Sequence, residues 1–277
     1  MQTDELVAHV EHMLDEYAGN RMVVSPPEGG DAEMPIFDTP LVGVADATDS
    51  LFERFVDPAV IGPKYRVPEG WLPGARSVVS VFFPFSDQVR DSNRGEGQAS
   101  LAWQQGKHDG TKVIADICQE ICDLLQSEGH RAIAPCRNGG NAYVEIPESV
   151  SGKPSFKASS AWSERHAAFV CGLGTFGISK GLITRRGMAG RFGSVVTDAP
   201  LQVTPREYEG VYEWCIHCSA CVQRCPVNAI TPGGQKNNAV CESWCVQVDE
   251  VHHLGDACGK CQIEVPCECR RPLSSGS

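Results

Sequence analysis

Apolar residues recur at helical spacing in two long stretches of the chain. The first lies between residues 3 and 17 and follows Thr3, a candidate cap; the second covers residues 108–126 and ends before Gly129. A third, shorter helix is predicted over residues 164–172, after three serines that can cap it. The apolar positions of the two long stretches are Leu6, Val7, Val10, Met13, Leu14 and Tyr17, then Val113, Ile114, Ile117, Ile121, Leu124 and Leu125.

Runs of β-branched and aromatic residues predict three strands. The clearest is SVVSVFFPF over residues 77–85, and the others cover residues 131–136 and 188–201. Residues 20–75 are rich in proline and glycine, so we predict that they wrap around the core; residues 86–107 are polar and predicted to form a surface loop. The order strand, helix, strand indicates an α/β or α+β fold.

Composition limits the classes of protein that this chain can be. Its 277 residues are 42% hydrophobic and 21% charged, which is ordinary for a folded protein. The net charge of -11 argues against nucleic acid as a partner, because phosphate binding needs a basic surface. No apolar run is long enough to cross a membrane and the first 25 residues do not resemble a signal peptide. We therefore predict a cytoplasmic protein without a membrane partner.

A cysteine motif dominates the C-terminal quarter of the chain. Residues 214–230 read WCIHCSACVQRCPVNAI, with Cys215, Cys218, Cys221 and Cys225 followed by Pro226. This is the C-x2-C-x2-C-x3-C-P run of bacterial ferredoxins, in which three thiolates hold one 4Fe-4S cluster and the fourth serves a second cluster. Zinc ribbons use two separated C-x2-C pairs instead. Four earlier cysteines are predicted to be small buried hydrophobic residues, namely Cys118, Cys122, Cys136 and Cys171.

A second cluster requires further ligands, and residues 241–269 supply six candidate cysteines. If the two motifs exchange ligands in the usual way, cluster one takes Cys215, Cys218, Cys221 and Cys267, and cluster two takes Cys225, Cys258, Cys261 and either Cys241 or Cys245. We favour Cys241, which leaves Cys245 and Cys269 as spare residues. Val265 stands where a regular second motif has a cysteine, so Cys267 must reach its cluster along a different backbone path.

Two adjacent clusters can pass electrons from one to the other, and these electrons need an acceptor. Residues 75–200 are too long and too regular in hydrophobic pattern to serve only as packing for a ferredoxin. We predict two domains, an acceptor domain over residues 1–203 and a ferredoxin-like domain over residues 204–277. The chain is therefore predicted to be a reductase that carries its own electron feed.

A glycine loop follows the third predicted helix. Gly172, Gly174 and Gly177 satisfy G-x-G-x-x-G. A dinucleotide fingerprint requires a strand before the loop and a helix after it, whereas here a helix precedes it. We expect these glycines to let backbone approach a bulky planar ligand or a neighbouring element.

The succession of motifs over residues 70–270 resembles epoxyqueuosine reductase and its relatives, the reductive dehalogenases. The segments that carry the resemblance are LPGARSV at 72–78, Glu164-Arg165, the glycine loop with Lys180, residues 193–198, and the cysteine-rich segment. The resemblance implies a nitroreductase-like, cobalamin-binding domain followed by a module with two 4Fe-4S clusters, one of which reduces the cobalt. By position, we expect the cofactor-binding residues to be Ser160, Arg165, Gly172, Gly174, Gly177 and Lys180.

Two departures from the family limit what the resemblance implies. Epoxyqueuosine reductases have an acidic residue, thought to donate a proton, where this chain has Ala158. We name Tyr143, Glu164 and His166 as candidate replacement acids; each has a structural alternative, as a core residue, an ion-pair partner or a packed histidine. The helical-repeat domain that often follows in the family and helps hold tRNA has no counterpart here, so a tRNA substrate is not expected.

Three functions remain open. The first is a corrinoid-dependent iron-sulfur reductase that acts on a small molecule or modified nucleoside, with a ferredoxin or flavodoxin as electron donor. The second is an electron-transfer or activating partner of another corrinoid protein, with no substrate of its own. The third is a flavin-bound variant, because nitroreductase-like folds commonly hold flavin.

Overall fold

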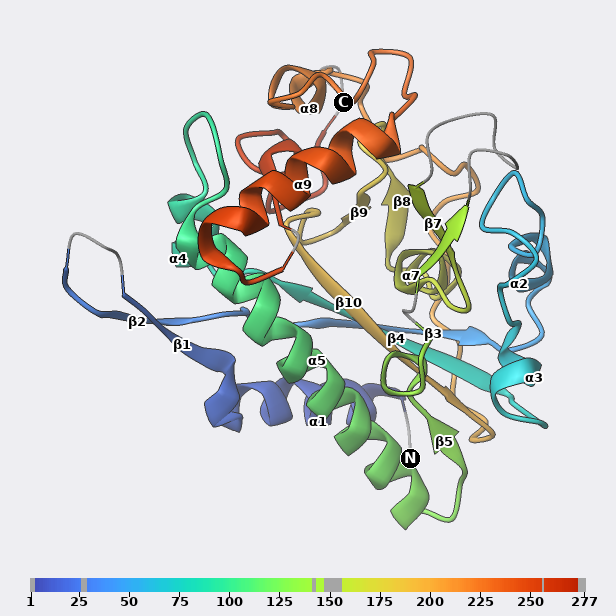
Figure 1. Ribbon diagram of the computed structural model, residues 1–277. Coiled ribbons are helices and arrows are strands. Elements are labelled where there is room, and N and C mark those ends of the chain that lie inside the picture. Colours follow the sequence, from blue (N-terminus) through green and yellow to red (C-terminus); the bar gives the residue numbers. More distant parts are fainter. Residues whose placement is uncertain (1–2, 26–28, 141–142, 147–155, 256, 274–277) are drawn as a thin grey trace.

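The computed structural model describes residues 3–25, 29–140, 143–146, 156–255 and 257–273, with the side chains of 143–146, 156–159 and 252 left out. Its centre is a four-stranded antiparallel sheet in the order β3, β4, β10, β5 (Figure 1). These strands are β3 (Leu41–Asp46), β4 (Ser77–Pro84), β10 (Gly190–Thr197) and β5 (Ala132–Ile133). Every residue of β4 is buried, as its continuous apolar run predicts.

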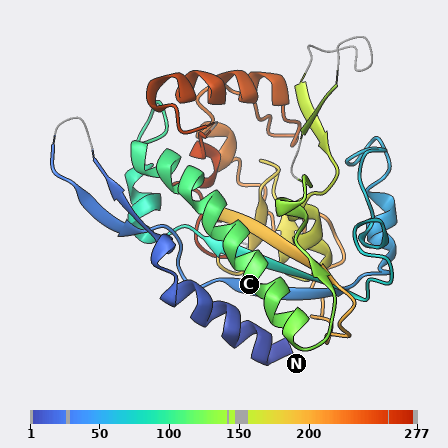
Figure 2. The ribbon, with the colours of Figure 1, turned by 60° about the horizontal axis from the view of Figure 1, so that its bottom comes forward.

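Two helices cover one face of this sheet. They are α1 (Thr3–Glu16) and α5 (Leu101–Ser127); in Figure 2, α5 (green) crosses the strands and α1 (blue) lies below it. The apolar stripe of α5 packs on Val79, Val81 and Val195 in one hydrophobic cluster. Gly193 of β10 allows this close approach, because an added Cβ would lie 2.7 Å from the Cys118 Sγ of α5.

The opposite face carries the elements that lead to the candidate site. These are α2 (Ser50–Arg54), α3 (Pro68–Trp71), α7 (Glu164–Val170) and the hairpin of β8 (Gly174–Phe176) and β9 (Leu182–Thr184). They share a second hydrophobic cluster with Ala45, Val78 and Val196 of the sheet. A second hairpin, β6 (Tyr143–Ile146) with β7 (Phe156–Ser160), precedes α7.

The cysteine-rich segment follows the sheet and packs on both hydrophobic clusters. It contains α8 (Ala220–Gln223), α9 (Asn238–His252) and the 3-10 turn η3 (Lys260–Gln262). Val248 and Ile263 join the cluster under α5, whereas Trp214 and Val265 join the cluster around α7. The segment is therefore anchored to the rest of the chain by shared cores.

The mixed α/β fold is confirmed, and so are the main helices and the strands at 77–85 and 188–201. Cys118, Cys122 and Cys171 are buried as expected, while Cys136 is partly exposed. The predicted strand at 131–136 is shorter, because it gives way to the 3-10 turn η2 (Pro135–Arg137). No helix among the described residues has the length and apolar character needed to cross a membrane.

Two sequence predictions were wrong. Residues 20–75 do not merely wrap the core: besides α2 and α3 they contain the turn η1 (Ala18–Asn20) at their start, the β1 (Arg21–Val24) and β2 (Ala32–Pro35) ribbon, and strand β3 of the central sheet. Residues 86–107 contain α4 (Asp87–Ser92) and the first turns of α5, capped by Ser100. The polar composition of these stretches hid the elements, since Gly106 and Gly110 replace apolar residues where α5 touches its neighbours.

Close packing between β3 and the end of α7 leads to a stability prediction. A Cβ at Gly43 would lie 2.2 Å from the Cys171 carbonyl oxygen. We expect Gly43→Ala to destabilise the protein by about 1–3 kcal/mol, because the backbone of α7 must move. The midpoint of thermal unfolding should fall, whereas Gly70→Ala, whose Cβ would meet only the Arg66 Cβ at 3.5 Å, should leave it unchanged or raise it. Equal midpoints for the two variants would contradict this packing.

Candidate functional site

Four cysteines from two distant segments line one small cavity. They are Cys215, Cys218 and Cys221 of the ferredoxin-type motif and Cys267 near the end of the described chain. The remaining walls come from the turn of the β8–β9 hairpin, from Met188 and from residues of the cysteine segment, namely Gly177, Ile178, Ser179, Ile183, Ile216, Val265 and Pro266. A set of four thiols around one apolar cavity fits the donor set of a 4Fe-4S cluster.

Local backbone geometry gathers these thiols. His217 and Ser219 adopt positive φ values of 52° and 59°, so the loop curls tightly between the first three cysteines. Burial raises the pKa of the Cys267 thiol to about 12, with further contributions from Cys221, Cys215 and Cys218. The thiols are therefore close enough to disfavour one another's ionised form, which bound iron would offset.

Cys267 reaches this cavity by pairing its backbone with the start of β10. Its carbonyl oxygen accepts from Met188 N at 2.9 Å, and the Glu268 carbonyl accepts from Ala189 N at 3.0 Å. Gly187 permits this approach, because an added Cβ would lie 2.2 Å from the Glu268 oxygen. This is the irregular path required by the valine at position 265.

The other cysteines gather on the side of α9. Burial raises the pKa of Cys258, and the nearby Cys241 and Cys225 raise it further. Burial also raises the pKa of Cys261, and the nearby Cys258 and Cys241 add to that rise. Cys241 and Cys245 lie one helical turn apart, and a hydrogen bond between them lowers the pKa of Cys241 to about 6 and raises that of Cys245. Both remain candidates for the same ligand position.

The described residues include no group of three or more His, Cys, Asp or Glu side chains placed to hold a single metal ion. Backbone amides also approach the sulfurs: Ala229 N donates to the Cys225 Sγ at 3.2 Å. Such bonds are among the features that tune cluster potentials.

Polar contacts attach the second cysteine group to the region after α4. The buried Lys260 donates from Nζ to the carbonyl oxygens of Asn93 and Gly95, at 3.0 and 3.4 Å, and Asn93 Nδ2 donates to the Cys258 oxygen at 3.0 Å. Gly259 lies so close to Trp103 of α5 that a Cβ would be 2.1 Å from its ring. The loop that carries Cys258 and Cys261 is thus held in place by the region after α4 and by α5.

Glu164 is a half-buried acid at the start of α7. Trp162 Nε1 donates to Ser194 Oγ at 2.8 Å, and Ser194 Oγ donates to Glu164 Oε2 at 2.6 Å. The other carboxyl oxygen is buried and has no hydrogen-bond partner in the described part of the chain. Burial raises the pKa of Glu164 to about 7, although the hydrogen bonds oppose that shift. The carboxyl group can therefore hold a proton near neutral pH.

The two other candidate acids differ from Glu164. His166 shares a hydrogen bond with Ser163 Oγ at 2.7 Å, and its ring lies 4.9 Å from the rings of both Phe55 and Phe176. Burial lowers its pKa to about 4, so it is neutral at neutral pH and is packed among aromatic side chains. Tyr143 lies in β6 opposite Ser160, and its side chain is outside the described part.

The residues expected to bind a cofactor do not form one cluster. Arg165 is exposed on α7 and close enough to lower the pKa of Cys241. Ser160 donates its hydroxyl hydrogen to the Trp162 oxygen at 2.5 Å, and Lys180 donates to the Tyr212 hydroxyl at 2.8 Å.

The three glycines of the loop lie in different surroundings. Gly174 faces backbone, because a Cβ there would lie 1.9 Å from the Ile183 oxygen. Gly172 approaches Thr204 and Pro205, and Gly177 lines the cysteine cavity.

Sequence reasoning missed the partners of Glu164. Ser194 lies 30 positions after Glu164 along the chain, and Trp162 lies two positions before it. The only signal in the sequence is that Ser194 is a polar residue inside an apolar strand. A buried hydroxyl in such a strand needs a hydrogen-bond partner.

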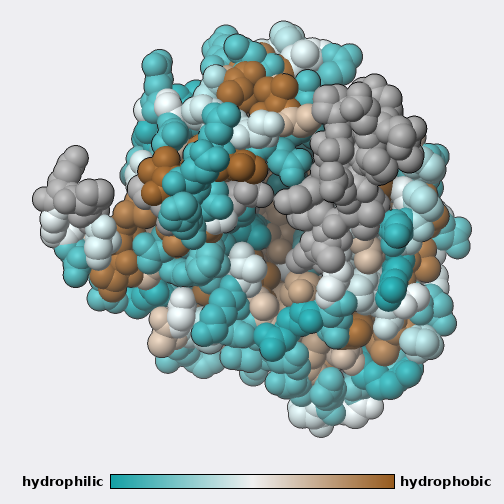
Figure 3. Space-filling view, in the orientation of Figure 1, coloured by the Kyte–Doolittle hydropathy of each residue, from teal (hydrophilic) through white to brown (hydrophobic). Residues whose placement is uncertain are grey.

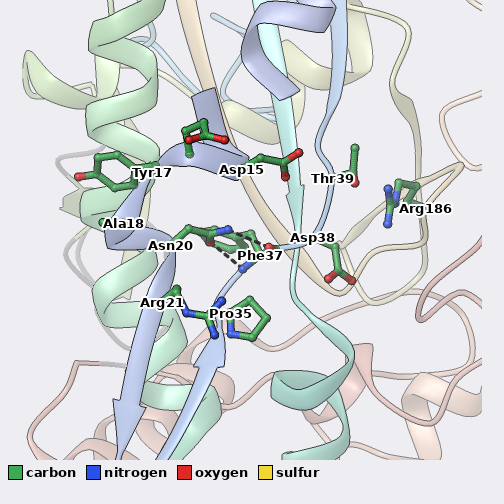
Figure 4. A pocket seen from close by; sticks show the side chains of 11 residues that line it. Asp15, Tyr17, Ala18, Asn20, Arg21, Pro35, Phe37, Asp38, Thr39 and Arg186 are labelled. Atoms are coloured by element: carbon green, nitrogen blue, oxygen red, sulfur yellow. Dashed lines mark hydrogen bonds between the residues drawn. The ribbon is translucent and has the colours of Figure 1, made fainter. Parts of the chain in front are cut away.

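Two hollows are visible beyond the cysteine cavity. Figure 3 shows the face in view hollowed below α9. A larger groove of about 590 Å³ lies where α1 leads into β1, and Figure 4 shows Asp15, Asn20, Asp38 and Arg186 among its polar lining. No cysteine and none of the candidate acids line that groove, so we place the site at the cysteines and Glu164.

Comparison with known proteins identifies an iron-sulfur segment and the fold. A family model described as a 4Fe-4S binding domain matches residues 209–231. Epoxyqueuosine reductase from Bacillus subtilis aligns with a TM-score of 0.52 at 19% identity, over 96% of this chain and 67% of that one. An epoxyqueuosine reductase solved with a modified tRNA-Tyr stem loop aligns with a TM-score of 0.53 at 18% identity, over 96% and 67%.

The reductive dehalogenases share the same fold. One, whose structure suggests a mechanism for B12-dependent dehalogenation, aligns with a TM-score of 0.55 at 16% identity, over 98% of this chain and 37% of its own. No curated protein matches the chain in sequence. The chain thus has the fold of epoxyqueuosine reductases and reductive dehalogenases, with a 4Fe-4S binding segment, and it spans about two thirds of the former and little more than a third of the latter.

The cysteine cavity predicts how iron content responds to substitution. Cys267→Ser removes one of the four thiols that line the cavity. If two clusters are held as the sequence predicts, iron should fall from about eight to about four atoms per chain. Cys269→Ser is the matched control, because Cys269 is exposed and does not line the cavity. Iron analysis after anaerobic reconstitution checks this. Equal iron in the two variants would show that Cys267 is not a ligand.

The environment of Glu164 predicts a titration near neutrality. In infrared difference spectra, a protonated carboxyl band should disappear with a midpoint near pH 7, because burial disfavours the ionised form. The band should be absent in Glu164→Gln and present in Glu53→Gln, an exposed carboxyl of α2. If wild type and Glu164→Gln titrate alike, the buried acid is not Glu164.

Proposed function

We propose that this protein is an iron-sulfur reductase in which two 4Fe-4S clusters feed a cobalamin bound beside α7. The substrate would be a small organic molecule or a modified nucleoside. The observation that carries the proposal is the position of Glu164 and Arg165. Glu164 is a half-buried acid with a raised pKa, and Arg165 is an exposed cation close to Cys241. The acid and the second cysteine group therefore border the same region of the molecule.

The residues present fit these groups. The cavity with four cysteines supplies the donor set of one cluster, and Cys225, Cys258 and Cys261 with Cys241 or Cys245 supply that of the other. Bound clusters supply one-electron transfer, and a bound corrinoid supplies reduction through a strongly nucleophilic cobalt centre. Arg165 is the best placed residue to contact the amide or phosphate groups of such a cofactor, since the hydroxyl of Ser160 and the ammonium of Lys180 already have partners.

Glu164 would donate the proton that reduction of the substrate requires. Oε2 is held by Ser194, whereas Oε1 is buried without a hydrogen bond among the described residues, so Oε1 is the oxygen that would carry the proton. An acid with a pKa near 7 is well matched to proton transfer at neutral pH. In this way Glu164 takes the role of the acid that the sequence lacks at position 158.

A relay protein is the second candidate. The alanine at position 158 favours it, because a protein that only passes electrons to another corrinoid protein needs no proton donor. A flavin-bound variant is distinguished from both by its cofactor. A tRNA substrate, which one neighbour was solved with, has less support here, given the net charge of -11.

Cofactor retention tests the proposal directly. Protein with reconstituted clusters, offered cobalamin without oxygen and then desalted, should retain about one cobalt per chain, since a single α7 region offers the site. Arg165→Glu should retain less, and Glu164→Gln should retain as much as wild type, because only the proton donor is lost. Full iron content with no cobalt would overturn the proposed corrinoid site. If flavin is bound instead, the flavin-bound variant is the better hypothesis.

A further inference from the structure

Four arginines gather beside the first cysteine cavity in a chain that is acidic overall. Arg185 and Arg186 form the turn after β9, and Arg270 and Arg271 follow Cys269. The chain contains 24 basic and 35 acidic side chains, so four adjacent arginines are a local reversal of its charge. We refer to these four residues as the arginine patch.

Backbone hydrogen bonds bring the two pairs together. Arg271 N donates to the Arg185 oxygen at 3.3 Å, next to the bonds that join Cys267 and Glu268 to the start of β10. The same contacts that carry Cys267 into its cavity therefore place the two pairs side by side. The side chains of Arg185, Arg270 and Arg271 are exposed and that of Arg186 is half-buried.

The patch lies against the cluster-one cysteines. The Arg271 guanidinium lies 4.4 Å from the centre of the Trp214 ring, and Trp214 precedes Cys215. Pro272, the next residue after Arg271, lines the cysteine cavity itself. Cys218 is exposed, so this cavity reaches the surface near the arginines.

Exposed apolar side chains accompany the charges. Leu273 is 78% exposed directly after Pro272, and Val211 and Tyr212, shortly before Trp214, are 47% and 39% exposed. Acidic residues lie nearby as well. Glu207 pairs with Arg185, Asp38 shares a groove with Arg186, and Glu213 accepts from the backbone amides of Glu209 and Gly210. Apolar groups within a charged rim are typical of protein interfaces.

We propose that the arginine patch is the docking surface for a small acidic protein that carries one electron, of the ferredoxin or flavodoxin class. Electrons would enter at the cluster held by Cys215, Cys218, Cys221 and Cys267, while the cysteine group beside Arg165 faces the substrate side. In each encounter the carrier is oxidised by one electron and this cluster is reduced by one. The inference rests on the proposed function for its direction of electron flow.

Opposite charge favours this class of partner. An acidic carrier meets repulsion over most of a chain with net charge -11, and a local basic patch directs it to one place. Such steering depends on ionic strength, because salt screens exposed charges within about 10 Å at 0.1 M. A carrier that docks on the exposed Leu273 lies beside the cavity, because the neighbouring Pro272 lines it.

The rate of cluster reduction tests the docking surface without any substrate. Reduced flavodoxin is mixed anaerobically with the iron-loaded protein, and bleaching of the cluster absorbance is followed by stopped flow. Arg185→Glu with Arg270→Glu should slow the second-order rate at low salt by about tenfold or more, and should weaken its dependence on salt. The matched control is Arg54→Glu with Lys64→Glu, which changes the net charge equally at exposed sites near α2.

A cationic viologen radical provides the second measurement. It should reduce wild type and both double variants, which shows that the clusters are intact and that only protein docking is lost. The proposal is overturned if flavodoxin reduces the patch and control variants at equal rates. It is also overturned if the patch variant loses binding of tRNA while its rate of reduction by flavodoxin is unchanged. Because neither readout involves cobalamin or a substrate, failure of the proposed function leaves this test interpretable.

Discussion

The backbone pairing between Cys267-Glu268 and the start of β10 is the constraint on which the site depends. It brings the Cys267 thiol next to three thiols that lie more than 40 residues earlier in the sequence. The β8–β9 hairpin lines the same cavity. The Glu268 carboxylate is buried beside Arg94, with Nη2 to Oε1 at 3.0 Å, and beside Arg90 at 3.7 Å. A buried carboxylate without these cations would be costly, so the pairing and the ion pairs stabilise one another.

This pairing also connects the surface of the molecule with the region of α7. The segment that ends the cysteine set continues into Arg270 and Arg271 at the surface, while α9 turns the second cysteine group toward Arg165 and α7. Glu164 lies one residue before Arg165, with its carboxyl group turned inward to Ser194. The arginine patch, the cysteines and Glu164 thus lie on connected segments, in the order that the proposed electron path requires.

Part of this arrangement could be predicted from the sequence. The spacing of Cys215, Cys218, Cys221 and Cys225 indicates iron-sulfur chemistry because few other sites use it, and the all-apolar β4 and the stripe of α5 follow from hydrophobic period. The order of elements indicated the mixed α/β class. The 4Fe-4S segment and the fold neighbours agree with those predictions.

The rest depends on contacts that leave little trace in sequence. Strand β3 was hidden in a stretch rich in proline and glycine, and α5 begins among polar residues because glycines there admit Phe37 and Val89. The raised pKa of Glu164 results from burial by residues far apart in the chain. The central claim is that two clusters lie close together within one electron path. Electron paramagnetic resonance of the fully reduced protein tests it: about two spins per chain with broadening from mutual coupling are expected, and one uncoupled spin per chain would contradict it.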